Sequence, residues 1–134
     1  MKRNMELARQ ILLRMEAQET YLDDIPLEFE GYTEEQVHYN IMLLHEAGLI
    51  FAIDASSAGG LYWMPQRLTW QGHEFLDAAR DNKVWNKAKE IMAKTGGFAF
   101  EVAKPLLIDL LKQQFGITNF SFAKIRMSTG NLVG

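Results

Sequence analysis

The stretch LIFAIDASSAGGLYWMPQRLTWQGHEFLDAA, residues 49–79, decides the fold of this 134-residue chain. It holds two runs of residues that favour β-strands, 49–53 and 61–68, with a loop of small residues and two glycines between them. This pattern predicts a twisted hairpin with a loop of several residues. Thr69 has the side chain of a helix cap, and Gly72 lets the first turn of the following helix pack closely.

A first helix is predicted near the N-terminus. Asn4 can cap it, apolar side chains recur along it at helical spacing, and it is expected to end near Gln18. Residues 22–30 then alternate in part between apolar and polar side chains, and they include a proline. That alternation predicts a short strand, which the proline restricts to the edge of a sheet.

A second helix is predicted over residues 34–47, directly before the hairpin. Thr33 and Gln36 have the spacing of a capping box, and Gly48 is suited to the left-handed position that ends a helix. Helices, hairpin and a further helix in this order are typical of a winged helix-turn-helix domain, whose wing is the hairpin. Four hairpin side chains are expected to pack on the first helix and on the helix that follows the hairpin: Ile50, Ile53, Tyr62 and Leu68.

Two more helices are predicted after Asp81, the second over about residues 100–115, where Pro105 either kinks the helix or marks its first turn. We therefore expect an α+β protein, mainly α, with a winged helix-turn-helix domain followed by two C-terminal helices. The expected division is a winged-helix domain in 1–80, a helical extension for packing or dimerisation in 81–115, and a tail in 116–134 that is weakly structured or forms one short strand.

Composition narrows the classes of function. The chain has no cysteine, which excludes disulfides, thiolate nucleophiles and cysteine-bound metals. It has no apolar run long enough to span a membrane, and charges interrupt any signal-like segment near the N-terminus. We expect a cytoplasmic protein with no membrane partner.

Several stretches resemble a family of small phage and prophage proteins that is catalogued as a domain of unknown function. They are MKRNMELARQILL at the start, YTEEQVHYNIMLLHEAGLI before the hairpin, GGLYWMPQRLTWQGHEFLDAARDNKVWNKAKE after it, and TGGFAFEVAK. The resemblance covers roughly residues 1–112 and implies a winged-helix fold and a mobile-element origin. It implies no activity, substrate or catalytic residue.

A winged-helix domain of this kind suggests double-stranded DNA as a partner and a role in transcription regulation. The helix before the wing would enter the major groove, and the wing tip and the N-terminus would touch phosphates. The candidate contact residues are Lys2, Arg3, Gln36, His38, Tyr39, Ser56 and Ser57.

The charges fit this role poorly. The chain has a net charge of −3, and the run from Glu19 to Glu35 holds seven carboxylates and no Lys or Arg. The same helix face begins with Glu34 and Glu35, and the wing tip has no positive charge. Because DNA affinity comes largely from Lys and Arg at phosphates, a second interpretation stands beside the first. In it the chain is a non-enzymatic module that binds a host or phage protein, as an inhibitor or an assembly adaptor, through the acidic helix face or the apolar C-terminal helices.

No arrangement of catalytic residues can be recognised in the sequence, so we expect a protein that is not an enzyme and has no cofactor. His38 and His45 are two helical turns apart, roughly 10 Å, too far to share a metal ion. We therefore predict no metal site.

The C-terminal helices have more apolar surface than one small domain needs. The last helix has a broad stripe, which predicts a symmetric homodimer, whereas the alternative is that the stripe folds back onto the winged-helix core. The predicted interface residues are Leu106, Leu107, Leu110 and Leu111.

Overall fold

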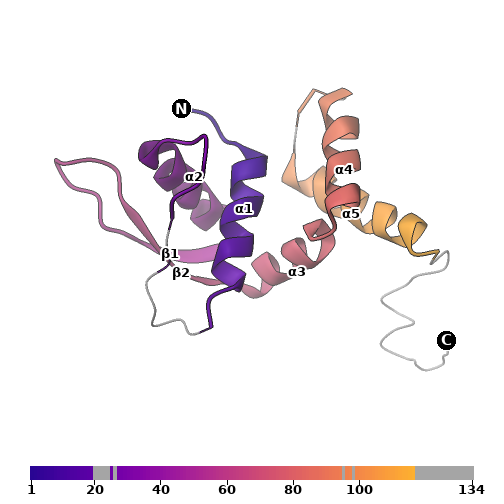
Figure 1. Cartoon of the computed structure of the whole chain (residues 1–134), viewed down its shortest axis with the longest axis horizontal. Helices are drawn as coiled ribbons and strands as arrows, with labels where there is room; N and C mark the ends of the chain where they lie inside the picture. Colours follow the sequence, from indigo (N-terminus) through magenta and orange to yellow (C-terminus); the bar gives the residue numbers. More distant parts are fainter. Residues whose placement is uncertain (20–24, 26, 95, 98, 117–134) are drawn as a thin grey trace. The chain divides into compact units, whose positions relative to one another are not determined.

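A computed structural model describes residues 1–134 except 20–24, 26, 95, 98 and 117–134, so nearly all of the predicted tail lies outside the described residues. The described elements are α1 (Met5–Glu16), α2 (Glu34–Glu46), β1 (Ile50–Asp54), β2 (Trp63–Leu68), α3 (Trp70–Ala79), α4 (Asn82–Lys94) and α5 (Phe100–Gln114). The protein is therefore α+β and mainly helical, as predicted (Figure 1). The chain divides into two compact units, Met1–Ala79 and Arg80–Gly134.

The first helix begins at the predicted cap. The Asn4 side chain accepts the Leu7 N–H at 3.0 Å, and the Asn4 N–H donates to Asn40 Oδ1 of α2 at 2.8 Å. Asn40 is buried and also donates to the Gln36 carbonyl at 2.9 Å, so its polar atoms are satisfied. These bonds tie the start of α1 to the middle of α2. The apolar stripe of α1 is buried: Leu7, Ile11, Leu12 and Met15.

The second helix has the predicted capping box and the predicted glycine at its end. The Thr33 and Gln36 side chains each accept the other's backbone N–H, and Gly48 adopts a φ of 78°. The box satisfies two N–H groups at the start of the helix. Gly48 then turns the chain directly into β1.

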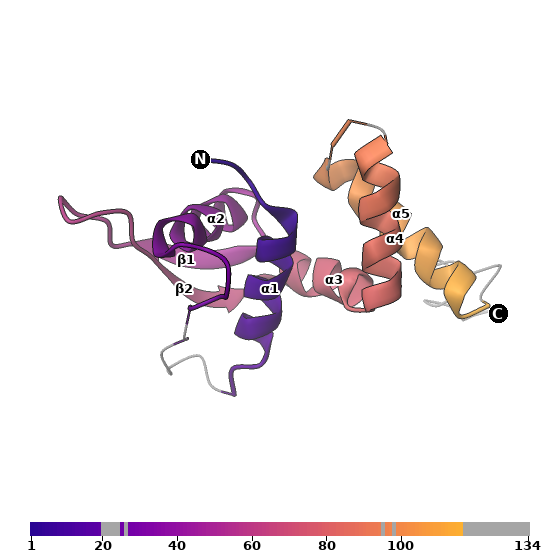
Figure 2. The same ribbon diagram turned by 45° about the horizontal axis from the view of Figure 1, so that its top comes forward.

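The two strands form an antiparallel hairpin, and its loop projects away from α1 and α2 in both ribbon views (Figures 1 and 2). Ile50 pairs with Leu68 and both are buried, which confirms that they pack inward. A bulge between Phe51 and Ala52 shifts the register. Ile53 and Tyr62 are 47% and 46% exposed, so the expectation that they pack inward was wrong. Strand alternation puts Ile53 on the face opposite Ile50.

Thr69 directly precedes α3, and its hydroxyl donates to the Gly48 carbonyl at 2.6 Å and accepts the Gly72 N–H at 3.0 Å. Gly72 packs so closely on Leu49 that a Cβ at this position would overlap the Leu49 carbonyl. The close packing predicted for Gly72 is thus confirmed. These contacts hold the first turn of α3 against the junction between α2 and β1.

The edge strand predicted for residues 22–30 is absent from its described part, 25 and 27–30. Phe29 is instead buried under the guanidinium of Arg14, whose Cζ lies 4.7 Å from the ring centroid. The Phe29 carbonyl accepts the Tyr32 N–H in a turn. The described part of this segment is therefore held by a contact with α1 and by a turn, and not by hydrogen bonds to a neighbouring strand.

In the second unit, α4 and α5 pack on each other. Asp81 caps α4 by accepting the Val84 N–H at 3.0 Å, and its other carboxylate oxygen accepts from Gln114 Nε2 at 2.8 Å. This brings the end of α5 to the start of α4. Pro105 lies inside α5 rather than in its first turn. The buried apolar side chains of the pair are Val84, Trp85, Ala88, Met92, Ala103 and Leu107.

Candidate interaction surface

His38 was named as a candidate DNA contact, which requires an exposed side chain, and this expectation of exposure was wrong. Its side chain is 2% exposed, and its ring lies 4.3 Å from the ring of Tyr62. His38 Nδ1 is 3.0 Å from the Trp63 nitrogen and 3.1 Å from the Trp63 oxygen. Helical spacing shows which side chains share a face of α2, but it does not show that the hairpin covers this one. His38 is therefore not available to read a base edge.

His45 lies two turns further along α2 and also holds the hairpin. Its Nδ1 accepts the Ala52 N–H at 3.1 Å. Its ring centroid is 5.3 Å from that of Trp63 and 5.9 Å from that of Phe51. The two histidines thus attach the hairpin to α2, one at each strand.

The other candidate residues on α2 have mixed positions. Gln36 is exposed, but its Oε1 accepts the Thr33 N–H at 2.8 Å and is thus engaged in the helix cap. Tyr39 is half-buried. The predicted base-reading set is therefore not brought together on one open face.

The hairpin loop uses both of its candidate hydroxyls internally. Ser56 Oγ accepts the Tyr62 N–H at 2.9 Å, and Ser57 Oγ accepts the Gly59 N–H at 3.2 Å. The Ser56 N–H donates to Asp54 Oδ1 at 2.9 Å, and this bond, with help from the Ser56 hydroxyl, lowers the pKa of Asp54. The loop therefore keeps an anionic carboxylate at its base, which opposes phosphate binding.

Lys2 and Arg3 are exposed at the N-terminus. They directly precede Asn4, which is bonded to α2. They are the two candidate contact residues with a Lys or Arg side chain, whereas the chain from Met15 to Gln66 contains ten carboxylates and no Lys or Arg. The first unit therefore offers phosphate few positive charges around α2 and the hairpin loop.

The outward side of the hairpin is apolar, a feature that the sequence analysis missed. Phe51 lies opposite Arg67, and Ile53 lies opposite Met64. Phe51, Ile53 and Met64 are 46%, 47% and 40% exposed, and the Arg67 guanidinium lies 5.7 Å from the Phe51 ring centroid. We call these four residues the hairpin outer face. The alternation of side chains along a strand could have predicted this face, because Phe51 and Ile53 must point away from the side on which Ile50 is buried.

The predicted dimer residues on α5 also need correction. Leu107 is fully buried within the chain, because it faces the same way as Ala103 on the side that α4 covers, so it cannot form an interface. Leu106, Leu110 and Leu111 are half-buried. The more exposed apolar side chains of α5 and its C-cap are Val102 and Phe115.

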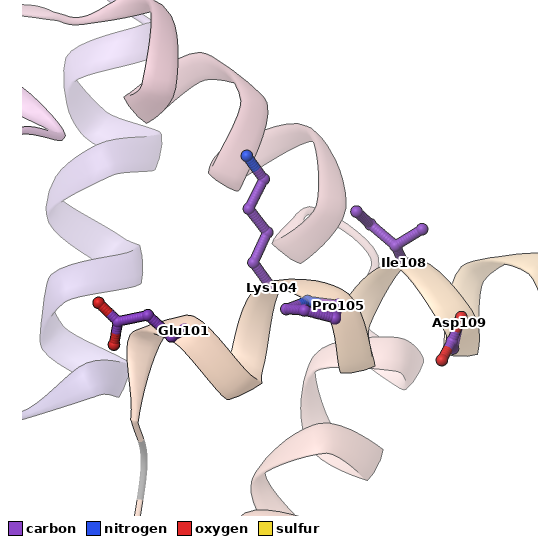
Figure 3. Close-up of a pocket in the computed structure, with 5 residues that line it drawn as sticks. All are labelled: Glu101, Lys104, Pro105, Ile108 and Asp109. Atoms are coloured by element: carbon purple, nitrogen blue, oxygen red, sulfur yellow. The ribbon is translucent and has the colours of Figure 1, made fainter. Parts of the chain in front are cut away.

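One hollow of about 490 Å³ lies along α5, lined by Glu101, Lys104, Pro105, Ile108 and Asp109. Figure 3 shows that all five come from this one helix, with Lys104 and Ile108 extending to the same side. The lining holds two carboxylates and an ammonium group. Among the described residues, no group of three or more His, Asp or Glu side chains can hold a metal ion.

None of the helices in the described part of the chain is long and apolar enough to cross a membrane.

The comparisons with known proteins identify a family. Residues 2–99 match the family described as "Hypothetical protein (DUF2513)". A protein of Haemophilus influenzae named "Uncharacterized protein" is 41% identical over 115 residues, which cover 84% of this chain and 98% of that protein. No solved structure matches the chain. Because the family match spans well over half of the sequence, the chain belongs to the DUF2513 family.

Proposed function

We propose that the unit Met1–Ala79 is a winged helix-turn-helix domain that binds another protein through the hairpin outer face. The order α1, α2, β1, β2, α3 and the projecting hairpin loop support the winged-helix assignment. The phage or prophage origin belongs to the same proposal and rests on the resemblance of the sequence alone.

The exposed apolar side chains of the hairpin carry the proposal. Phe51, Ile53 and Met64 sit on neighbouring positions of one sheet face and leave apolar area in water, although the same strands bury Ile50 and Leu68. Contiguous exposed apolar surface is costly unless a partner covers it.

The charges on and near the hairpin outer face indicate which kind of partner surface would match it. Apart from Arg67, the face has no Lys or Arg, and neither does the chain from Met15 to Gln66, whereas Glu34 and Glu35 are exposed at the start of α2. A protein surface with an apolar centre and Lys or Arg at its rim complements this pattern, whereas a phosphate backbone does not.

A DNA-binding transcription regulator is the second candidate. The order of the elements favours it, since winged helices commonly serve this role, and this support is analogy at the level of the fold. The exposed Lys2 and Arg3 would then contact phosphates. In this version the contact avoids the acidic start of α2.

Site-specific photocrosslinking in cells tests the first proposal. A photoreactive residue at Ile53 should capture a partner protein, and the same residue at Val102, equally apolar and exposed on α5, should not. The captured protein, once purified, should bind the full chain, and its affinity should fall at least about tenfold in Ile53→Ser/Met64→Ser. Val102→Ser should keep the wild-type affinity.

A titration of duplex DNA at several salt concentrations separates the two candidates. Tight binding whose affinity falls steeply with salt, and is lost in Lys2→Ala/Arg3→Ala, would favour the regulator. Equal capture from Ile53 and Val102 would exclude a specific role for the hairpin outer face.

A further inference from the structure

The hairpin is held on α2 by two imidazole rings on one face of the helix. His38 and His45 are seven residues apart, which is close to two full turns. His45 Nδ1 lies 3.1 Å from the Ala52 nitrogen of β1, and His38 Nδ1 lies 3.0 Å from the Trp63 nitrogen of β2. Each strand of the hairpin is thus fastened through a ring nitrogen.

The bond at His45 requires an unprotonated Nδ1. The Ala52 N–H is a donor and nothing else, so the ring nitrogen must supply a lone pair, and its proton must lie on Nε2. An imidazolium has a proton on both nitrogens and cannot accept. Two N–H groups would then point at each other, and the Ala52 N–H would lose its partner.

His38 differs because its Nδ1 has two neighbours of opposite kind. It lies 3.0 Å from the Trp63 nitrogen and 3.1 Å from the Trp63 carbonyl oxygen. An unprotonated Nδ1 accepts from the N–H, and a protonated Nδ1 donates to the carbonyl. The His38 contact therefore keeps one hydrogen bond in either protonation state.

We propose that His45 is a proton-sensitive latch that releases β1 from α2 when its ring becomes charged, while His38 keeps β2 attached. His45 is only half-buried, so solvent protons reach it. Histidine is the side chain whose charge ordinarily changes between about pH 5 and pH 8. The latch is a property of the fold and does not depend on what the hairpin outer face binds.

Among the described residues, the groups that contact His45 include no carboxylate, so a charged ring would gain only the attraction of the two aromatic rings beside it. From β1 these are the Ala52 N–H and the ring of Phe51, and from β2 the ring of Trp63. The Arg67 guanidinium lies over the same Phe51 ring, so a second cation is close. The titratable and charged groups of α2 and of the elements packed on it are Glu34, Glu35, His38, Tyr39 and Glu46 of α2, Asp54 of β1, Arg67 of β2, and Glu6, Arg9, Arg14 and Glu16 of α1.

Amide hydrogen exchange on the full chain tests the latch. The protection factor of the Ala52 amide, corrected for the intrinsic effect of pH, should fall about tenfold between pH 8 and pH 5, as expected for loss of one hydrogen bond. His45→Asn is the matched variant, because its amide oxygen takes roughly the place of Nδ1 and accepts at either pH. It should remove the pH dependence, and His38→Asn should retain it.

The tautomer gives an independent measurement that needs no variant. Ring ¹⁵N shifts of the wild-type protein at about pH 8 should show the His45 proton on Nε2. A proton on Nδ1 would overturn the proposal, as would protection of Ala52 that does not change with pH. Loss of the pH dependence in His38→Asn, or its persistence in His45→Asn, would place the titrating group elsewhere.

Discussion

Arg9 in α1 and Ala79 at the end of α3 are joined by a hydrogen bond of 2.6 Å from the guanidinium Nε to the backbone carbonyl, across 70 positions of sequence. Arg9 is almost fully buried. A cation at this place meets the negative end of the α3 dipole and satisfies a carbonyl that the helix itself leaves without a partner.

Arg9→Met should therefore destabilise the chain by about 1–3 kcal/mol, because it keeps most of the apolar stem but leaves the Ala79 carbonyl buried and without this donor. Urea unfolding followed by circular dichroism measures the change. Lys87→Met is the control, since the Lys87–Glu90 pair at 3.5 Å is exposed and such pairs contribute about 1 kcal/mol or less. Equal losses in both variants would contradict a special role for Arg9.

Gly72→Ala should lower stability by about 1–3 kcal/mol although alanine favours a helix by about 1 kcal/mol, because the new methyl group overlaps the Leu49 carbonyl. Gly59→Ala is the matched control. Its Cβ would meet only Ser57 Oγ, at the ordinary contact distance of 3.5 Å. Thermal unfolding of the two variants decides the matter, and a Gly72→Ala protein as stable as wild type would show that the backbone can move apart there.

The hydrogen bond from the Val84 N–H, more than any other contact, lowers the pKa of Asp81 below its ordinary value of 3.8. A lowered folded-state pKa stabilises the fold at pH values above the unfolded-state pKa, and this contribution disappears as the pH falls through the lower folded-state value. Asp81→Ala should therefore reduce the melting temperature at about pH 7 and reduce it less at about pH 2. Asp109→Ala, which removes an exposed carboxylate and its contact with Lys112 at 3.7 Å, should change little at either pH.

Glu34→Gln/Glu35→Gln should raise non-specific affinity for DNA, because it removes two negative charges from the exposed start of α2. Stability should change by about 0.5 kcal/mol or less, since surface substitutions have small effects and the capping box remains. Fluorescence anisotropy with a labelled duplex measures the affinity. Tight DNA binding by the wild-type chain that is abolished in Gln36→Ala would contradict the acidic-face argument.

The homodimer remains a prediction, with an interface limited to Leu106, Leu110 and Leu111 now that Leu107 is known to be buried. Light scattering at micromolar concentration should give twice the chain mass of 15.4 kDa, and Leu106→Gln/Leu110→Gln should give the single mass. Leu107→Ala should instead cost about 2–5 kcal/mol of stability without changing the mass. A wild-type chain of single mass would end the prediction.

The boundaries of the helices in the first unit were predictable because their signals are local. Asn4, Thr33 with Gln36, and Thr69 each bond to an N–H within three residues, and Gly48 needs only its own backbone conformation. Such contacts form inside one turn, so the order of residues is enough to reveal them. The same holds for the apolar stripe of α1.

The candidate site depended on contacts between distant segments. Periodicity places His38 and His45 on one face of α2, but only the folded hairpin, 25 positions beyond His38, turns that face into an interior one. The choice of which strand face to bury likewise follows from packing on α1 and α2. Sequence alone thus determined the elements and their caps, because short-range hydrogen bonds set them. The tertiary structure decided which helix and strand faces are buried, because burial depends on packing between segments that are far apart in the sequence.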